Sequence, residues 1–203
     1  MKREIEKKFD VPLDWNDEGF LYALQDCSVA AGYEIDKPEI LNRRFTYYDT
    51  SSLDLHKMNG TFRLVEGFDS LKYAGSHRYD LKVGPLEERF EESIWGNEFL
   101  DINGIFRKEI EKIGLLGQFS EKAMADMRNY KGDIRRGSLV VEYTLDYVAV
   151  RGARHPFKEL EFELKEGEKR DLNELSDIVQ TSFNLNSLIQ QKYSRILRML
   201  GKI

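Results

Sequence analysis

Hydrophobic and charged residues alternate at a spacing of two along much of this chain of 203 residues. The clearest case is KELEFELK (residues 158–165), in which every second residue from Glu159 to Glu163 is a glutamate and the residues between them are Leu160 and Phe162. Successive side chains of a strand point to opposite faces, so this pattern predicts a β-strand with one apolar and one charged face.

Several segments share this strand pattern, and others have the spacing of helices. Strands are expected at residues 3–11, 43–50, 61–67, 78–84, 87–96, 124–130, 139–150 and 157–165. Helices are expected at residues 16–31, 98–113, 171–183 and 185–200, with Gly32 ending the first and Asp171 capping the third. The sequence therefore predicts an α+β fold in a single domain, residues 1–203. Its centre would be an antiparallel closed β-barrel of about eight strands that forms a tunnel, with helices packed outside and a C-terminal helix.

The polar faces of the predicted strands carry charges of both signs at central positions. Arg89 and Glu91 share one face, and Glu142 and Asp146 share another. A sheet with one face in water would show a looser mixture of polar residues. The alternative is that the apolar faces pack outward against the helices and the charged faces line a tunnel with room for one small ligand. Because buried charges need partners, the carboxylates of such a tunnel predict a cation as ligand, and its Lys and Arg residues predict a polyanion.

The charge balance and the cysteine content of the chain limit the classes of function that we expect. The chain has 36 acidic and 31 basic residues and a net charge of −5, whereas a nucleic-acid binder typically has a basic excess. Its single cysteine, Cys27, allows no internal disulfide and favours a reducing compartment. Neither a signal peptide at the charged N-terminus nor an apolar run of about 20 residues is evident. We therefore expect a cytoplasmic protein that binds neither nucleic acid nor membrane.

Lys192 lies in an unusual place, within the apolar stripe of the predicted last helix. The other members of this stripe are Leu185, Leu188, Ile189, Ile196 and Leu200. A lysine on an apolar face usually extends its ammonium to the edge of that face. The alternative is that the ammonium of Lys192 reaches the mouth of the tunnel.

Nine short motifs follow one another from the first strand to the last helix. They are Glu4-Ile5-Glu6-Lys7-Lys8, Tyr47-Tyr48-Asp49-Thr50, Phe62-Arg63-Leu64-Val65, Asp80-Leu81-Lys82, Arg89-Phe90-Glu91, Arg128, Glu142 with Asp146, Glu159-Leu160-Glu161, and Lys192. In this order they resemble the motifs of the CYTH family, the triphosphate tunnel metalloenzymes, which begin with ExExK. One departure is Val65, where the family has a second basic residue. The phosphate contacts are then one fewer, unless Arg43, Arg44 or Arg78 takes that place.

The resemblance implies a role for each of these charged residues. The ligands of Mg²⁺ or Mn²⁺ would be Glu4, Glu6, Glu91, Asp146, Glu159 and Glu161. The phosphate contacts would come from Lys8, Arg63, Lys82, Arg89, Arg128 and Lys192. The catalytic residues would be Lys8, Glu142 and Asp146, with the two carboxylates orienting the attacking water.

The resemblance also implies an activity, metal-dependent hydrolysis of a small-molecule triphosphate inside the tunnel. Inorganic triphosphate is the first expected substrate, and thiamine triphosphate or a nucleoside triphosphate is another. The first alternative is a class IV adenylyl cyclase, which makes cyclic AMP from ATP, although the sequence identifies no residue that would recognise the base. The second alternative is a sensor that binds polyphosphate or nucleotide without turnover. A homodimer is also left open.

Overall fold

The computed structural model describes residues 2–67, 77–85, 89–96 and 99–203. Its strands are β1 (Lys2–Glu4), β2 (Glu6–Val11), β3 (Glu34–Ile35), β4 (Glu39–Asp49), β5 (Thr61–Gly67), β6 (His77–Val83), β7 (Arg89–Gly96), β8 (Ser120–Arg136), β9 (Leu139–Val150), β10 (Phe157–Glu166) and β11 (Asn186–Ser187). Its helices are α1 (Asp17–Ala30), α2 (Asp54–Lys57), α3 (Arg107–Lys112), α4 (Lys169–Phe183) and α5 (Lys192–Met199). The predicted α+β class is confirmed.

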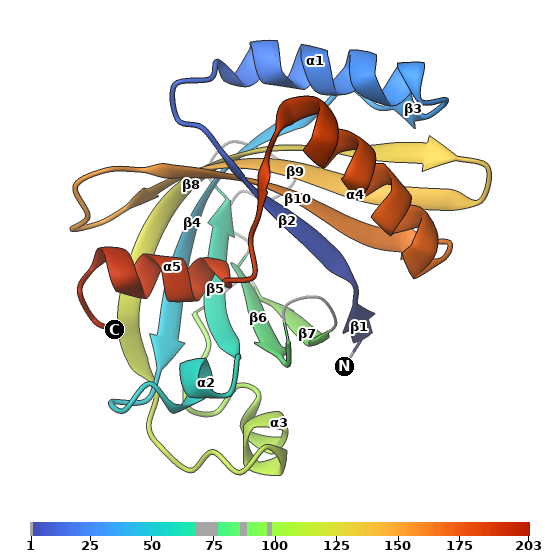
Figure 1. Ribbon diagram of the computed structural model, residues 1–203. Helices are drawn as coiled ribbons and strands as arrows, with labels where there is room; N and C mark the ends of the chain where they lie inside the picture. Colours follow the sequence, from blue (N-terminus) through green and yellow to red (C-terminus); the bar gives the residue numbers. More distant parts are fainter. Residues whose placement is uncertain (1, 68–76, 86–88, 97–98) are drawn as a thin grey trace.

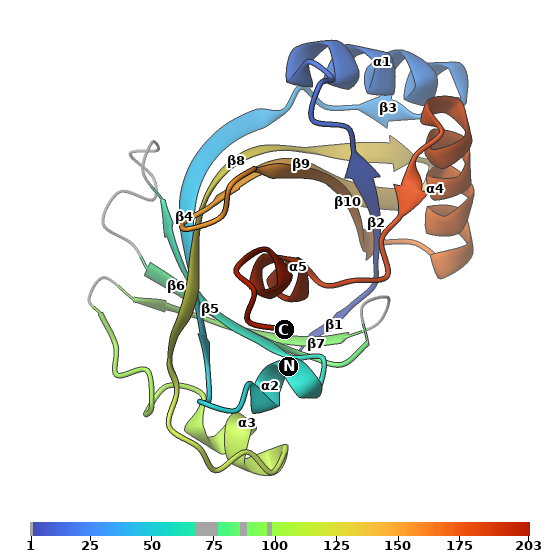
Figure 2. The same cartoon turned by 60° about the vertical axis from the view of Figure 1, so that its left-hand side comes forward.

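The strands form one antiparallel sheet in the order β1-β7-β6-β5-β4-β8-β9-β10-β2-β11, with β3 paired to β8. Figure 1 shows this sheet strongly curled, and Figure 2 shows its strands following an arc around α5. Long strands that twist in the same sense produce such a curl. The predicted barrel-like tunnel architecture is therefore confirmed.

Two consecutive pieces of the N-terminal strand lie near opposite ends of the sheet, β1 at one end and β2 next to the short β11 at the other. Ile5 alone separates β1, in which Glu4 lies opposite Arg89 of β7, from β2, in which Lys8 lies opposite Glu161 of β10. The ladder of strand pairs is therefore open, and the expectation of a single closed ladder is corrected. The reason is that the N-terminal strand changes partner at Ile5, so that it pairs with each neighbour over only part of its length.

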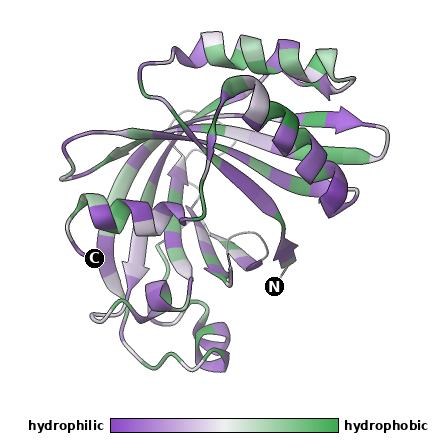
Figure 3. Ribbon diagram, in the orientation of Figure 1, coloured by the Kyte–Doolittle hydropathy of each residue, from purple (hydrophilic) through white to green (hydrophobic). Residues whose placement is uncertain are grey.

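The apolar faces of β2, β8, β9 and β10 point outward and are covered by α1 and α4. Phe9 and Phe162 of the sheet belong to the same buried cluster as Leu24 of α1 and Leu175 of α4. Each such side chain stabilises the fold by about 1.5–3 kcal/mol when fully buried. Figure 3 shows the alternation of hydrophobic and hydrophilic residues along the strands. The outward packing of the apolar faces agrees with the tunnel interpretation.

Helix α5 packs on the opposite, inner face of the sheet. Its Tyr193 ring stacks on Tyr47, with the ring centroids 5.1 Å apart, and Ile196 packs in a cluster with Val148 and Phe157. Figure 2 shows α5 within the arc of the strands. The C-terminal helix therefore fills one part of the curl and directs its first residue toward the charged remainder.

The last helix is shorter than the predicted range 185–200. Asn186 and Ser187 instead form β11 against β2, and the Leu188 amide donates to the Lys8 carbonyl at 2.8 Å. Ile189, expected in the apolar stripe, is 93% exposed. Pairing with the edge of β2 satisfies backbone groups that a helix there would have satisfied internally.

Two other predicted helices also differ in their extent. Of the range 98–113, residue 98 lies outside the described residues, and among residues 99–113 only α3 is helical. Phe106, at the N-terminal boundary of α3, has a left-handed backbone with φ of 57°. Helix α4 begins earlier than expected, with Glu168 rather than Asp171 at the N-cap. None of the helices within the described ranges has the length and apolar character needed to cross a lipid bilayer.

Candidate functional site

A charged cavity of about 250 Å³ lies on the inner face of the curled sheet. Its acidic lining residues are Glu4, Glu91, Glu142, Asp146, Glu161 and Glu163, and its basic ones are Arg43, Arg63, Arg78, Lys82, Lys131, Lys165 and Lys192. A smaller cavity of about 40 Å³, which Lys8 and Arg89 also line, shares Arg63, Lys82, Glu161 and Lys192 with it. The charged strand faces thus line one connected interior.

The N-terminal strand places Glu4 and Glu6 beside the guanidinium of Arg89. Arg89 donates from Nε to Glu4 at 2.8 Å, and its Nη2 atom lies 2.8 Å from Glu6. Lys82 contacts the other oxygen of Glu4 at 2.6 Å and Glu91 at 3.4 Å. Burial opposes ionisation of Glu4, but the charges of Lys82 and Arg89 hold its pKa well below the usual value. Glu4 is therefore an ionised carboxylate at neutral pH.

Lys8 links the first strand to β10. Its ammonium lies 3.2 Å from Glu6 and 3.0 Å from Glu161. Burial alone would lower the pKa of Lys8, but the charges of Glu161 and Glu6 raise it. Glu4, Glu6 and Lys8, which alternate along the N-terminal strand, therefore all join the interior charge network.

Lys192 is the point on which three carboxylates converge. Its ammonium contacts Asp146, lies 2.7 Å from Glu161 and lies 3.7 Å from Glu159. Burial works against the charge of Lys192, but these carboxylates, Asp146 first among them, raise its pKa well above the usual value. Of the two placements considered for Lys192, the structure shows the one in which the ammonium enters the interior.

Glu159 is the least satisfied of these carboxylates. Its side chain is 0% exposed, and its Oε2 atom has no hydrogen-bond partner. Arg195 donates to the other oxygen, Oε1, at 3.4 Å. Burial raises the pKa of Glu159 to about 7, and the charges of Lys192 and Lys8 offset only part of this cost. Glu159 therefore titrates near neutral pH, whereas the same two lysines hold the pKa of Glu161 well below its usual value despite burial.

Asp80 is an interior residue to which the sequence analysis gave no role. It is fully buried and binds Arg63 at 2.9 Å, Arg78 at 2.8 Å and the Ser93 hydroxyl at 2.8 Å. Burial opposes its ionisation, but the two guanidinium groups hold the pKa of Asp80 well below the usual value. Its position two residues before Lys82, on the same strand face, was the available signal. Asp80 orients the two arginines that flank Val65.

The structure brings nearly all of the predicted charged residues into this interior. They are Glu4, Glu6, Lys8, Arg63, Lys82, Arg89, Glu91, Glu142, Asp146, Glu159, Glu161 and Lys192. Glu142 faces Lys131 at 2.6 Å and Lys165 at 3.3 Å. Of the three arginines considered as replacements at Val65, Arg43 and Arg78 line the cavity. Arg43 also lines the groove described next, whereas Arg44 lines only that groove and pairs there with Asp126 at 2.7 Å.

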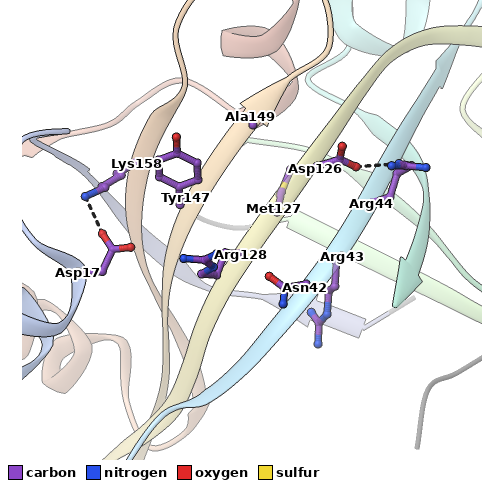
Figure 4. Close-up of a pocket in the computed structure, with 10 residues that line it drawn as sticks. All are labelled: Asp17, Asn42, Arg43, Arg44, Asp126, Met127, Arg128, Tyr147, Ala149 and Lys158. Atoms are coloured by element: carbon purple, nitrogen blue, oxygen red, sulfur yellow. Dashed lines mark hydrogen bonds and ion pairs between the residues drawn. The ribbon is translucent and has the colours of Figure 1, made fainter. Parts of the chain in front are cut away.

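Arg128 is the exception among the predicted site residues. It is exposed and lines a different groove, of about 570 Å³, on the outer face of the sheet. Figure 4 shows it there with Tyr147 and with the ion pair of Lys158 and Asp17. The neighbouring residue, Asn129, is the one that points inward and donates to Asp146. Because side chains alternate between faces, the expected interior placement was wrong by one residue.

The interior carboxylates suit a hard divalent cation in their chemistry. Mg²⁺ and Mn²⁺ prefer oxygen ligands, and Asp146, Glu159 and Glu161 present such oxygens toward one point. Within the described ranges, no group of three or more Asp, Glu, His or Cys side chains is by itself arranged to hold a metal ion. The donors therefore fit a metal in kind, and the cation that they face in this structure is the ammonium of Lys192.

No protein-family model and no curated protein matches this sequence, but solved structures match it over nearly its full length. A Bacillus halodurans protein, proposed to be an adenylate cyclase, has a TM-score of 0.63 and 16% identity, covering 96% of this chain and 98% of that one. A Pyrococcus horikoshii protein has a TM-score of 0.61 and 19% identity, with the same coverage. A proposed adenylyl cyclase of Hippeastrum with a dominant triphosphatase activity has a TM-score of 0.55 and 16% identity, covering 100% and 97%. These similarities show a shared fold.

Proposed function

We propose that this chain is a metal-dependent triphosphatase of the CYTH type, a triphosphate tunnel metalloenzyme, and that inorganic triphosphate is its preferred substrate. The observation that carries the proposal is the interior network, in which cations able to bind phosphate alternate with carboxylates able to bind metal. A simple anion-binding site would need the cations but few of the carboxylates. The order of the sequence motifs and the triphosphatase activity described for the Hippeastrum protein support the same function.

The size of the cavity supports a compact substrate. Pockets for drug-sized organic ligands measure roughly 300–1,000 Å³, whereas this interior measures about 250 Å³. Its lining is predominantly charged, which suits a polyanion better than an organic group. Inorganic triphosphate combines a high negative charge with a small volume, so it fits both properties.

The chain's own cations would bind and orient the phosphate groups. Lys8, Lys82 and Arg89 are presented by β2, β6 and β7, so they can contact a phosphate chain from different sides. Arg63 lies beside them and is held by Asp80. Phosphoryl transfer relies mainly on positioning and on stabilisation of developing negative charge, and rigidly held lysines and arginines supply both.

The carboxylates would bind the metal ion and orient the attacking water. Asp146, Glu159 and Glu161 would hold Mg²⁺ or Mn²⁺, and Glu4 of β1, Glu6 of β2 and Glu91 of β7 are further oxygen donors. The metal would supply charge neutralisation for the phosphate oxygens when bound. Glu142 and Asp146 share one face of β9, from which we propose that they orient the attacking water.

The position of Trp95 favours the adenylyl cyclase alternative. The Trp95 side chain lines the cavity, is 55% exposed and lies under the guanidinium of Arg78, whose carbon is 5.5 Å from the ring centroid. An exposed indole next to a guanidinium can stack on a nucleobase. ATP would then bind with its triphosphate in the charged interior and its adenine near Trp95.

A substrate panel tests these alternatives directly. Purified protein is incubated with inorganic triphosphate, thiamine triphosphate, ATP or long polyphosphate, each with Mg²⁺, with Mn²⁺ or with excess EDTA. We expect phosphate release from inorganic triphosphate with either metal and none with EDTA. The Lys82→Met variant is the control for contaminating phosphatases, because it removes a phosphate contact and should lose most of the activity.

Three outcomes would replace the proposal. Cyclic AMP formation from ATP, with inorganic triphosphate left intact, would identify a cyclase. Tight binding of triphosphate in calorimetry, with no product from any substrate, would identify a sensor. Full hydrolysis in EDTA would rule out the metal-dependent mechanism.

A further inference from the structure

Asp146, Glu159 and Glu161, which we call the carboxylate trio, share one cation, the ammonium of Lys192. We propose that Lys192 is a built-in competitor of the divalent metal: its ammonium and the metal bind the trio alternately. When metal occupies the trio, the displaced ammonium turns to the phosphate chain. This inference rests on the proposed function and adds to it a mechanism that makes metal and triphosphate bind together.

The distances make simultaneous occupation unfavourable. Lys192 lies within ion-pair distance of all three members of the trio, so its ammonium stands where their oxygens converge. A divalent cation bound to the same oxygens would lie a few ångströms from that ammonium, and like charges at such a distance repel strongly in a buried site. One of the two cations must therefore leave.

The position of Lys192 on α5 allows its ammonium to move. Lys192 is the first residue of α5, and its flexible four-carbon stem can rotate while the helix stays fixed. The helix itself is held by Tyr193, which stacks on Tyr47, and by the packing of Ile196. The ammonium can thus change partner without disturbing the apolar contacts of α5.

Glu159 gives an independent indication that the trio is not fully satisfied by an ammonium. Its Oε2 atom is buried without a hydrogen-bond partner and lies 3.7 Å from the Lys192 ammonium, the longest of the three contacts. An unsatisfied buried carboxylate oxygen costs free energy. A metal ion that draws all three carboxylates to ligand distance would satisfy it.

The ion pairs next to the carboxylate trio connect it to Lys8, one of the residues proposed to bind phosphate. Glu161 is shared between Lys192 and Lys8, and Lys8 is in turn shared with Glu6. When a lysine binds phosphate, the carboxylate that it leaves needs another cation, which the metal can supply. When a carboxylate binds metal, the lysine that it releases needs an anion, which the phosphate can supply. Each ligand therefore removes a cost of binding the other, and by thermodynamic linkage the coupling must be reciprocal.

The decisive measurement is Mn²⁺ binding without triphosphate, followed by calorimetry and by electron paramagnetic resonance. We expect Lys192→Met to bind Mn²⁺ at least about tenfold more tightly than the unmodified protein, because the competing ammonium is gone. Lys192→Arg keeps the positive charge and should not gain affinity. Lys165→Met is the matched control, since Lys165 is an interior lysine that contacts Glu142 and Glu163 rather than the trio.

Equal or weaker Mn²⁺ binding by Lys192→Met would overturn the proposal, and so would an equal gain in Lys165→Met. A second measurement does not depend on the folding of Lys192→Met. In NMR spectra of the lysine ammonium groups, with Lys192→Arg used to assign the signal, Mg²⁺ should shift the Lys192 signal; an unchanged signal would also overturn the proposal. Both readouts are independent of turnover, so a failure of the proposed triphosphatase function would be recognised separately by the substrate panel.

Discussion

Two glutamates on the same face of β10 should respond oppositely to the same substitution. Glu159 and Glu161 are two residues apart and both face the interior charges, Glu159 fully buried and Glu161 with a side chain that is 20% exposed. Replacement by glutamine keeps the shape of each side chain and removes its charge. We expect Glu159→Gln to stabilise the protein at neutral and alkaline pH and Glu161→Gln to destabilise it.

The magnitude for Glu159 follows from its pKa. Burial raises this pKa from the usual 4.5 to about 7. Each pH unit of that difference corresponds to about 1.36 kcal/mol, so ionised Glu159 costs the folded state about 3 kcal/mol. The unfolded chain releases the proton near pH 4.5 and the folded chain near pH 7, so stability falls with rising pH across this window. The gain from Glu159→Gln should therefore be absent below about pH 4.5, grow up to about pH 7 and stay constant above it.

For Glu161 the sign is reversed. The ammonium groups of Lys192 and Lys8, at 2.7 and 3.0 Å, hold the pKa of Glu161 well below its usual value. Its ionisation therefore stabilises the folded state above pH 4.5, and this contribution is lost as the pH falls further. Removing one partner of a buried ion pair costs about 3–5 kcal/mol, which is the expected loss in Glu161→Gln at pH 7.

Urea unfolding of the two variants and the unmodified protein, between pH 4 and pH 8, measures these differences. For a chain of this size, about 3 kcal/mol also corresponds to a change in melting temperature of about 6–12 °C. The reasoning would be refuted if Glu159→Gln lowered stability by the same amount at every pH. Such a result would mean that Glu159 is an ionised partner of Lys192 and Arg195 throughout the range.

Two further predictions concern Asp80 in the interior and Arg128 on the outer face of the sheet. Asp80→Asn should lower the free energy of unfolding by about 3 kcal/mol in urea titrations, because it leaves Arg63 and Arg78 without their shared carboxylate, and a loss below about 1 kcal/mol would contradict this role. Arg128→Ala should keep kcat/KM for triphosphate within about twofold, whereas Arg89→Ala should lower it by about ten- to a hundredfold, as expected for loss of a charge-assisted contact. A comparable loss in Arg128→Ala would mean that Arg128 reaches the substrate.

The sequence was sufficient to predict which side chains of a strand point inward, because side chains alternate between the two faces of a strand. Once the apolar residues of β10 point outward, Glu159 and Glu161 must point inward. Motif order then located the interior charges on strands far apart in the sequence. Arg128 shows the limit of this approach, since an isolated charged residue in a long strand carries no signal of its face, and the inward position in β8 belongs to Asn129.

The partners within the interior could not be predicted, because ion pairs depend on strand register and on depth along each strand. The sequence left open whether Lys192 enters the tunnel, and the family resemblance assigned it to phosphate, but neither indicated that three carboxylates would share it. It also did not reveal the buried role of Asp80. The apolar spacing after Leu185 suggested a helix, whereas a tertiary contact with the edge of β2 draws Asn186 and Ser187 into the sheet instead.

The change of partner at Ile5 has a consequence for how the chain folds during synthesis. The first strand needs β7 for its beginning and β10, residues 157–166, for the rest. At about 5–20 residues per second, a ribosome takes on the order of ten seconds to reach β10 after making β2. Throughout this interval the strand has no partner for most of its length, and an unpaired apolar strand would be prone to aggregate. The charges of Glu4, Glu6 and Lys8 would oppose such aggregation until β10 and then β11 have been synthesised.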